Sequence, residues 1–146
     1  MYALKQLARQ SIWVILATVA ALLSGCADMA TSTNVQVTLS GSQEVPPVTT
    51  AASGSGTITV GADKSVSGSV TTAGVVGVAA HIHDGAAGKN GPVIIPLTKT
   101  SDNVWSVAAG AKLTDPQYEN YKAGNLYVNV HSAANKGGEV RGQIKP

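Results

Sequence analysis

Short runs rich in valine, isoleucine and threonine follow one another along this 146-residue chain from about residue 35 to its end. Gly, Pro, Asn and Ser separate the runs at short intervals, which is typical of antiparallel strands joined by tight turns. The pattern predicts an all-β domain, an antiparallel Greek-key sandwich or barrel of about eight strands. The expected strands cover residues 35–39, 56–60, 65–71, 75–83, 93–97, 104–108, 126–131 and 139–144.

One segment departs from the strand pattern and predicts a single short helix over residues 115–123. Thr114 is a suitable N-cap, Pro116 is tolerated in the first turn, and Gln117 stands three residues after the threonine. Gly124 can end the helix, because glycine readily adopts the left-handed conformation found there. Two tyrosines in the segment share one face, so we expect the helix to pack on the β domain in a structural role.

The N-terminal segment has the order of features found in a secretory signal peptide. Lys5 and Arg9 form a positive region, and residues 11–23 are uncharged and mostly apolar. This apolar run is too short to span a bilayer, which takes about 20 residues. Residues 23–26 are Leu-Ser-Gly-Cys and resemble the bacterial lipobox, in which the cysteine becomes the first mature residue and carries the lipid. We therefore expect lipidation of Cys26.

This interpretation divides the chain into three parts. Residues 1–25 are the signal peptide, residues 26–34 are the lipidated cysteine and a flexible tether, and residues 35–146 are the β domain. The expected location is the bacterial cell envelope, periplasmic or surface-facing, with attachment to the membrane through the lipid. Ala27, and not an aspartate, follows the cysteine, which favours the outer membrane.

Net charge argues against a nucleic-acid partner. Without the two basic residues of the signal peptide, eight Lys and Arg balance eight Asp and Glu, so the rest of the chain is formally neutral. Such a balance gives neither a basic stripe for nucleic acid nor a cluster for phospholipid head groups. Cys26 is the only cysteine, so the β domain is expected to have no internal disulfide.

All three histidines of the chain fall in two of the expected strands. His81 and His83 are two residues apart, so on a strand they point to the same side. His131 ends a later strand, on the side opposite that strand's aliphatic residues. We expect all three imidazoles on the outside of the sheet or under a covering loop. Residues 84–92 are the candidate cover for the first two.

Three imidazole nitrogens in one place predict a metal site, because neutral imidazole is a ligand for copper, zinc, iron and nickel. A water molecule, Asp84, Tyr127 or Asn129 would supply a fourth ligand or hydrogen-bond the first three. Three histidines with a water also describe a catalytic zinc site, so zinc is an alternative on the ligands alone. The opposing interpretation is that these histidines carry no metal and only form hydrogen bonds.

Three stretches of the chain resemble the CHRD domain, first described in chordin and found in many bacterial secreted proteins. They are LSGSQEVPPV at 39–48, HIHDG at 81–85 with NGPV at 90–93, and LYVNVHS at 126–132 with GGEVRGQI at 137–144. The resemblance covers about residues 34–145, nearly the whole expected mature chain. It implies little about activity, since bacterial members are largely of undefined function.

A weaker similarity is to copper-zinc superoxide dismutase, which has a Greek-key barrel, a His-x-His pair on one strand and a further copper-binding histidine on a late strand. His81, His83 and His131 match these positions in order, which implies copper rather than zinc. No fourth histidine exists to bridge two metals, so dismutase activity is not expected. Arg141 follows at a distance that could mimic an active-site arginine, but its alternation with Glu139 equally fits an exposed strand pair.

These observations predict a lipid-anchored envelope protein that binds copper for storage, delivery or tolerance and is not an enzyme. The alternative is a metal-free structural or adhesion module that binds a protein partner of the envelope. Asp84, Glu139 and Arg141 are expected to form ion pairs at the surface, where such pairs contribute about 0–1 kcal/mol.

Overall fold

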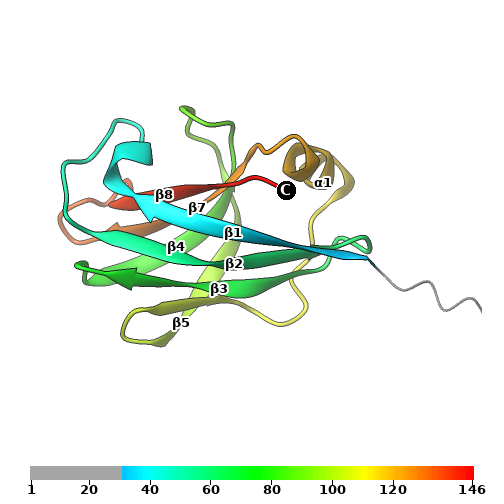
Figure 1. Ribbon diagram of the computed structural model, residues 1–146, viewed down its shortest axis with the longest axis horizontal. Coiled ribbons are helices and arrows are strands. Elements are labelled where there is room, and N and C mark those ends of the chain that lie inside the picture. The colour runs from blue at the N-terminus through cyan, green and yellow to red at the C-terminus, as the bar shows by residue number, and fades with distance from the viewer. Residues whose placement is uncertain (1–30) are drawn as a thin grey trace, which may run out of the picture.

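The computed structural model describes residues 31–146, which form eight strands, one α-helix and one short 3-10 helix (Figure 1). The strands are β1 (Ser32–Ser40), β2 (Ser53–Gly61), β3 (Val66–Ala73), β4 (Gly77–Asp84), β5 (Val93–Ser101), β6 (Val104–Val107), β7 (Leu126–Ser132) and β8 (Val140–Ile144). The helices are η1 (Gly41–Gln43), after β1, and α1 (Asp115–Lys122), between β6 and β7. The predicted all-β class with one short α-helix is therefore confirmed. The predicted signal peptide and Cys26 lie outside the described residues.

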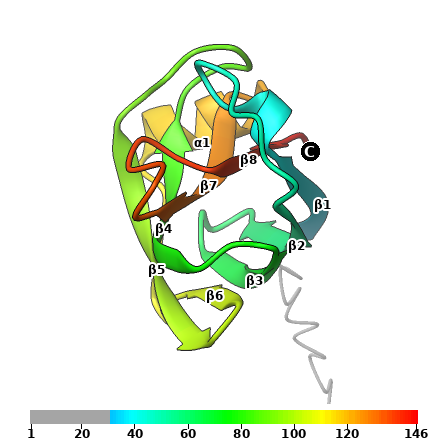
Figure 2. The same cartoon turned by 90° about the vertical axis from the view of Figure 1, so that its left-hand side faces the viewer.

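The strands form one closed antiparallel barrel in the order β1-β2-β3-β6-β5-β4-β7-β8. The consecutive strands β4, β5 and β6 are neighbours, and β7 returns to pair with β4, which is a Greek-key arrangement. Figure 2 looks toward one end of the barrel and shows the strands surrounding a single core. The sequence left a sandwich and a barrel open, and the pairing of β8 with β1 selects the barrel.

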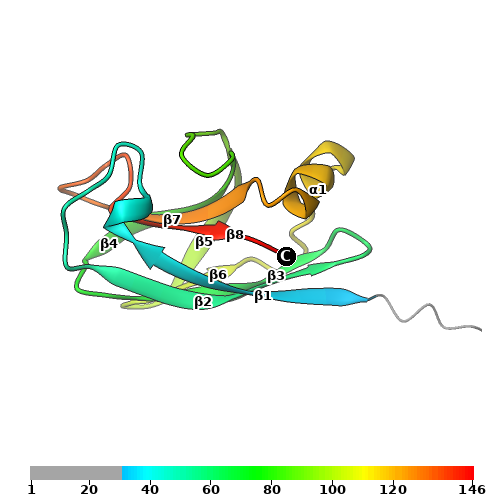
Figure 3. The ribbon, with the colours of Figure 1, turned by 45° about the horizontal axis from the view of Figure 1, so that its top comes forward.

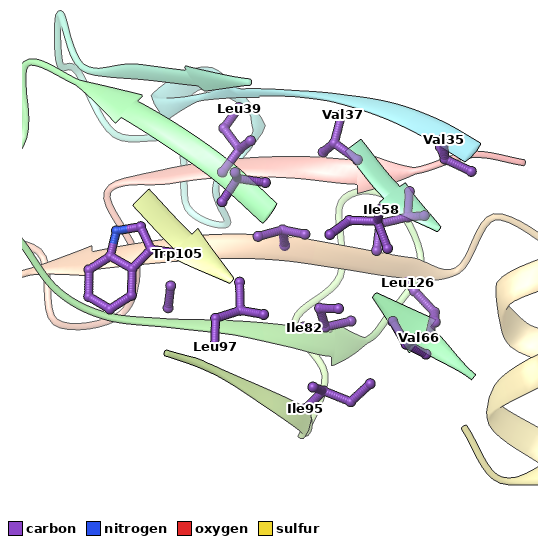
Figure 4. Packing of buried hydrophobic residues seen from close by; sticks show 14 of the residues in the cluster. Val35, Val37, Leu39, Ile58, Val66, Ile82, Ile95, Leu97, Trp105 and Leu126 are labelled. Carbon is purple, nitrogen blue, oxygen red and sulfur yellow. The ribbon is translucent and has the colours of Figure 1, made fainter. Parts of the chain in front are cut away.

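Aliphatic side chains fill the barrel interior (Figure 4). Alternate residues of each strand point inward, and on β7 these are Leu126, Val128 and Val130. Trp105 of β6 is also buried and lies toward one end of the core. Complete burial of one such aliphatic side chain contributes roughly 1.5–3 kcal/mol, so the core determines which side of each strand faces inward.

The predicted tether extends too far into the folded domain. Ser32 and Asn34 belong to β1, where they pair with Gly61 and Thr59 of β2. These first residues of the strand are exposed and polar, so no alternation of apolar side chains marks them in the sequence. The backbone ladder with β2 extends the strand beyond its buried part.

The helix α1 has the predicted capping residues. The Thr114 hydroxyl accepts a hydrogen bond from the Gln117 N–H, and the Gln117 side chain accepts one from the Thr114 N–H. Tyr121 is buried against the core, as expected for a structural helix. Figure 3 shows α1 at one end of the barrel, near the β2–β3 turn. Among residues 31–146, no helix is long and apolar enough to cross a bilayer.

The predicted apolar side of β4 is only half correct. Ala80 and Ile82 are buried as expected, but Val76 and Val78 are 83 % and 60 % exposed. The pairing with β7 shifts register just after Gly77, which puts the start of the strand out of phase with the rest. The strand also begins two residues later than predicted, at Gly77.

The two sides of β7 are both covered, and every residue of this strand is buried. Its inner side faces the core. Over its outer side lie the segments that join β1 to β2, β4 to β5 and β7 to β8, which Figures 1 and 2 show on the same flank of the barrel. This covered outer side of β4, β7 and β8 is called the polar layer below, because the side chains enclosed there are polar or aromatic.

Candidate metal centre

The three histidines form one cluster in the polar layer. Their ring centres are 4.9 Å apart for His81 and His131, 5.6 Å for His81 and His83, and 6.3 Å for His83 and His131. One ring nitrogen of each lies within 4.8 Å of the other two, so the group could hold a metal ion. Antiparallel pairing of β4 with β7 brings them together, since Ala79 is opposite His131.

Backbone carbonyls fix the orientation of two of the rings. Nδ1 of His83 lies 2.9 Å from the oxygen of Gly91, and Nδ1 of His131 lies 2.9 Å from the oxygen of Lys136. A carbonyl oxygen only accepts, so Nδ1 carries the proton in both rings and Nε2 has a free lone pair. Carbonyls that orient ligating histidines in this way are usual around metal sites. The Gly91 contact places the 84–92 segment against His83, as the sequence predicted.

The third ring points its nitrogen at the same place. Nδ1 of His81 lies 2.9 Å from Nε2 of His131, and in the metal-free protein it donates a hydrogen bond to that lone pair. His83 and His131 are 8 % and 9 % exposed, whereas His81 is only partly buried. The cluster is therefore closed by the barrel and its covering segments, and it opens toward solvent beside His81.

The surroundings favour neutral imidazoles. Burial lowers the pKa of His81 below its usual value near 6.5, and the imidazoles of His131 and His83 lower it further. Burial also lowers the pKa of His83, against the opposing effect of its hydrogen bond to Gly91. The lowered pKa values favour the neutral imidazole in both rings, which is the form that binds metals.

One ring nitrogen is left without a partner. Nε2 of His83 is buried and has no hydrogen-bond partner among residues 31–146. A buried polar atom left unsatisfied costs about 1–3 kcal/mol. A cation placed between the three rings would satisfy this nitrogen, together with the lone pair of His131.

The residues expected to provide a fourth ligand have different surroundings. Asp84 accepts two hydrogen bonds from Nδ2 of Asn120, at 2.9 and 3.0 Å, and is outside the histidine cluster. The Tyr127 hydroxyl accepts a hydrogen bond from the Gly91 N–H at 3.2 Å. Asn129 is opposite His81 on β7, and its buried Oδ1 has no partner among the described residues. Asn129 is therefore the protein group best placed to assist the histidines.

The sequence left Arg141 either as a mimic of an active-site arginine or as part of an exposed strand pair, and its burial rules out the exposed pair. This residue of β8 is 1 % exposed, and its guanidinium carbon lies 3.4 Å from the centre of the Tyr127 ring. The other face of that ring stacks on His83, with centres 4.8 Å apart and planes at 7°. Arg141, Tyr127 and His83 therefore form one stack in the polar layer.

Glu44 is a second buried charged residue that the sequence did not single out. Burial raises its pKa to about 7, although the charge of Arg141 and a hydrogen bond from Asn129 both oppose the shift. Gly138 leaves room for it, since a Cβ there would lie 2.4 Å from Oε1 of Glu44. Glu44 and Arg141 both stand inside the family-like stretches of the sequence, and that position is the one signal that could have marked them.

The predicted ion pairs of Asp84, Glu139 and Arg141 are not found among residues 31–146. The Glu139 carboxylate instead accepts hydrogen bonds from the hydroxyls of Thr50 and Ser132 and from the amide of Asn135. Parity along a strand shows which residues share a side, but it does not show what covers that side.

Comparison with protein families matches the CHRD domain over residues 35–144. No curated protein and no solved structure matches the chain. The matched region begins within β1 and extends to the last residue of β8, so it contains every strand of the barrel and all three histidines.

Proposed function

Because this chain belongs to the CHRD domain family, we propose that it is an envelope CHRD protein that binds one copper ion through His81, His83 and His131. The observation that carries the proposal is that two carbonyl-oriented rings direct their unprotonated Nε2 atoms into one partly closed cluster with His81, and that Nε2 of His83 has no partner there among the described residues. Storage, delivery or tolerance of copper are the roles that such a site would serve.

Ligand chemistry supports copper over zinc, because the affinity of imidazole ligands rises toward Cu(II) along the first transition series and is lower for Zn(II). The 2.9 Å between Nδ1 of His81 and Nε2 of His131 is the length of a hydrogen bond in the metal-free protein, and the nitrogens of the three rings lie within 4.8 Å of one another. The two rings would exchange this hydrogen bond for bonds to the metal.

We propose binding and not turnover. Three histidines leave no fourth to bridge a second metal, so a site like that of a two-metal dismutase is not assembled from this sequence. We further propose that the protein is held in the cell envelope by lipid on Cys26. Loss of the protein from the membrane fraction in a Cys26→Ser variant would support that anchor, and unchanged fractionation would contradict it.

Titration of the purified protein with Cu(II), followed by electron paramagnetic resonance, tests the metal site. We expect one Cu(II) per chain with hyperfine splitting from nitrogen, lost in the His81→Ala/His83→Ala variant. Gln36→Ala is the control, because Gln36 contacts Thr57 on another side of the barrel. A wild-type spectrum without nitrogen splitting, or a double variant that keeps it, would contradict the proposal. Competition with Zn(II) in the same titration checks the preference for copper.

Failure of that titration would favour the second candidate, a metal-free adhesion or structural module. The exposure of Val76 and Val78 favours this metal-free module. The two valines line a hollow of about 300 Å³ with Ala133 and Ala134. Such a module would hold its envelope partner in the presence of chelator and after replacement of all three histidines. Loss of the partner under either condition would contradict it.

A further inference from the structure

Arg141 is buried, and no carboxylate lies within ion-pair distance in the described part of the chain, although Glu44 is near enough for the two charges to interact. Its Nη2 donates to the carbonyl of Ala86 at 3.0 Å and to the side chain of Gln143 at 3.2 Å, and its Nη1 has no partner there. Removing a charge from water costs several kcal/mol, and an apolar residue of similar size is often the more stable choice. Stability of the barrel alone therefore does not explain an arginine at this position.

The guanidinium is well placed to fix the Tyr127 ring. At 3.4 Å from the ring centre it makes a close cation–π contact, an interaction that is strongest where both groups are desolvated. The opposite face of the same ring lies parallel to the imidazole of His83. Because Arg141 holds the Tyr127 ring from one face, the other face of this ring is a fixed flat surface on which the His83 imidazole stacks.

In the same orientation His83 makes its hydrogen bond. Its Nδ1–H donates to the Gly91 carbonyl while the imidazole lies within 7° of the plane of the Tyr127 ring. That bond in turn determines the tautomer, which leaves Nε2 bare and directed into the cluster. Segment 85–91 is also held at its start, where Nε2 of Gln143 donates to the Gly85 carbonyl at 2.9 Å.

We infer that Arg141 is a positioning residue of the histidine site: through the Tyr127 ring it holds His83 in the orientation and tautomer that leave Nε2 free. The inference rests on the proposed metal site, because metal binding is what gives this orientation of His83 a function. The orientation it describes belongs to the metal-free protein and is measurable without a metal.

The test combines Arg141→Lys with two matched variants. Lysine keeps the charge but lacks the planar group that stacks on the ring. Asn90→Ala removes an anchor of segment 85–91, the hydrogen bond from Nδ2 to the Val45 carbonyl, and leaves both hydrogen bonds of Arg141 in place. Tyr127→Phe keeps the stacked ring and removes only the hydroxyl that accepts from Gly91. If Arg141→Lys does not fold, Arg141→Met, an apolar side chain of similar length, replaces it with the same expected change of tautomer.

Long-range ¹H–¹⁵N spectra of the metal-free protein report the tautomer of His83. We expect Nδ1–H in the wild type, in Asn90→Ala and in Tyr127→Phe, and a mixture of tautomers in Arg141→Lys. Affinity for Cu(II) should fall at least about tenfold in Arg141→Lys, a usual effect of removing support for a ligating histidine. It should stay within about threefold in the two matched variants.

Three results would overturn the inference. A folded Arg141→Lys variant with wild-type tautomer and affinity would remove the positioning role. An equal loss in Asn90→Ala would show that Arg141 only anchors the 85–91 segment. A loss of the tautomer in Tyr127→Phe would assign the effect to the hydroxyl and not to the stack. If the wild type binds no Cu(II) but the tautomer changes as expected, the proposed function fails and the positioning role stands.

Discussion

The outer sides of two parts of the same barrel differ sharply. On β2 and β3 the outward residues are mostly serine and threonine, and they remain exposed or half-buried. On β7 and β8 the outward residues include Tyr127, Asn129, His131 and Arg141, all of them buried. The inner sides of both parts contribute to one aliphatic core. The difference therefore arises from the covering segments and not from the sheet.

This comparison shows how a barrel can hold a chemical site without giving up its core. A polar group inside the barrel would displace aliphatic contacts and lack partners. Outside the sheet, segments 85–91 and 133–138 supply carbonyls that satisfy the histidines. They also keep water away from most of the cluster. The polar layer is thus a second, smaller interior built on the outside of the first.

The largest expected effect tests how tightly the polar layer is packed. Gly138 has a φ of +135°, and a Cβ there would lie 2.4 Å from Glu44 Oε1 and 2.7 Å from Asn129 Nδ2. Gly138→Ala should therefore lower the free energy of unfolding by about 2–4 kcal/mol, through backbone strain and overpacking. Urea denaturation followed by circular dichroism measures it.

The neighbouring glycine is the matched control for this change. A Cβ on Gly137 would meet no atom within 4 Å. Gly137→Ala should change the free energy of unfolding by less than about 1 kcal/mol. Equal losses in the two variants would show that the segment is sensitive for a reason other than contact with the polar layer.

The second expected effect is a dependence of stability on pH that comes from Glu44 in the polar layer, and the exposed side of the barrel lacks such a group. Glu44 has a folded-state pKa of about 7, above the ordinary 4.5, so the folded state binds its proton more tightly than the unfolded state. Stability from this group is present below pH 4.5 and is lost as the pH rises through 7. Between pH 5 and pH 8 the free energy of unfolding of Glu44→Gln, relative to that of the wild type, should rise by on the order of 2 kcal/mol.

Glu139→Gln is the control for Glu44→Gln. Hydrogen bonds, first of all from Ser132, lower the pKa of Glu139, so its contribution is lost only as the pH falls below its ordinary value. The free energy of unfolding of Glu139→Gln should therefore change with pH in parallel with that of the wild type between pH 5 and pH 8. Denaturation curves at several pH values measure both. A Glu44→Gln curve parallel to the wild type as well would contradict a proton-binding Glu44 in the polar layer.

The smallest effect compares one polar-to-alanine change on each outer side. Asn129→Ala removes a buried amide that donates to the Gly137 carbonyl and should cost about 1 kcal/mol. Ser67→Ala, on the exposed side of β3, should stay within about 0.5 kcal/mol of the wild type. Thermal unfolding of both variants gives the difference. Similar values for the two would mean that the covering segments do not bury the polar layer as described.

The sequence alone determined the all-β antiparallel class, because the alternation of aliphatic and polar residues and the spacing of turns are local properties, and the pairing of β8 with β1 then selected the barrel. Local chemistry also determined α1, whose Thr114 and Gln117 form the predicted capping box. The same alternation placed His81 and His83 on one side of a strand. It misplaced Val76 and Val78, because a register shift against a distant strand is not visible locally.

Only the tertiary structure decided that the three histidines meet, since this depends on the pairing of β4 with β7 across more than forty residues of chain. It also decided that Arg141 and Glu44 are buried. Their burial comes from segments that fold over the outside of the sheet, and no periodicity in β8 or η1 encodes that cover. Strand parity fixes the side on which a residue lies, and packing of distant segments fixes whether that side meets water.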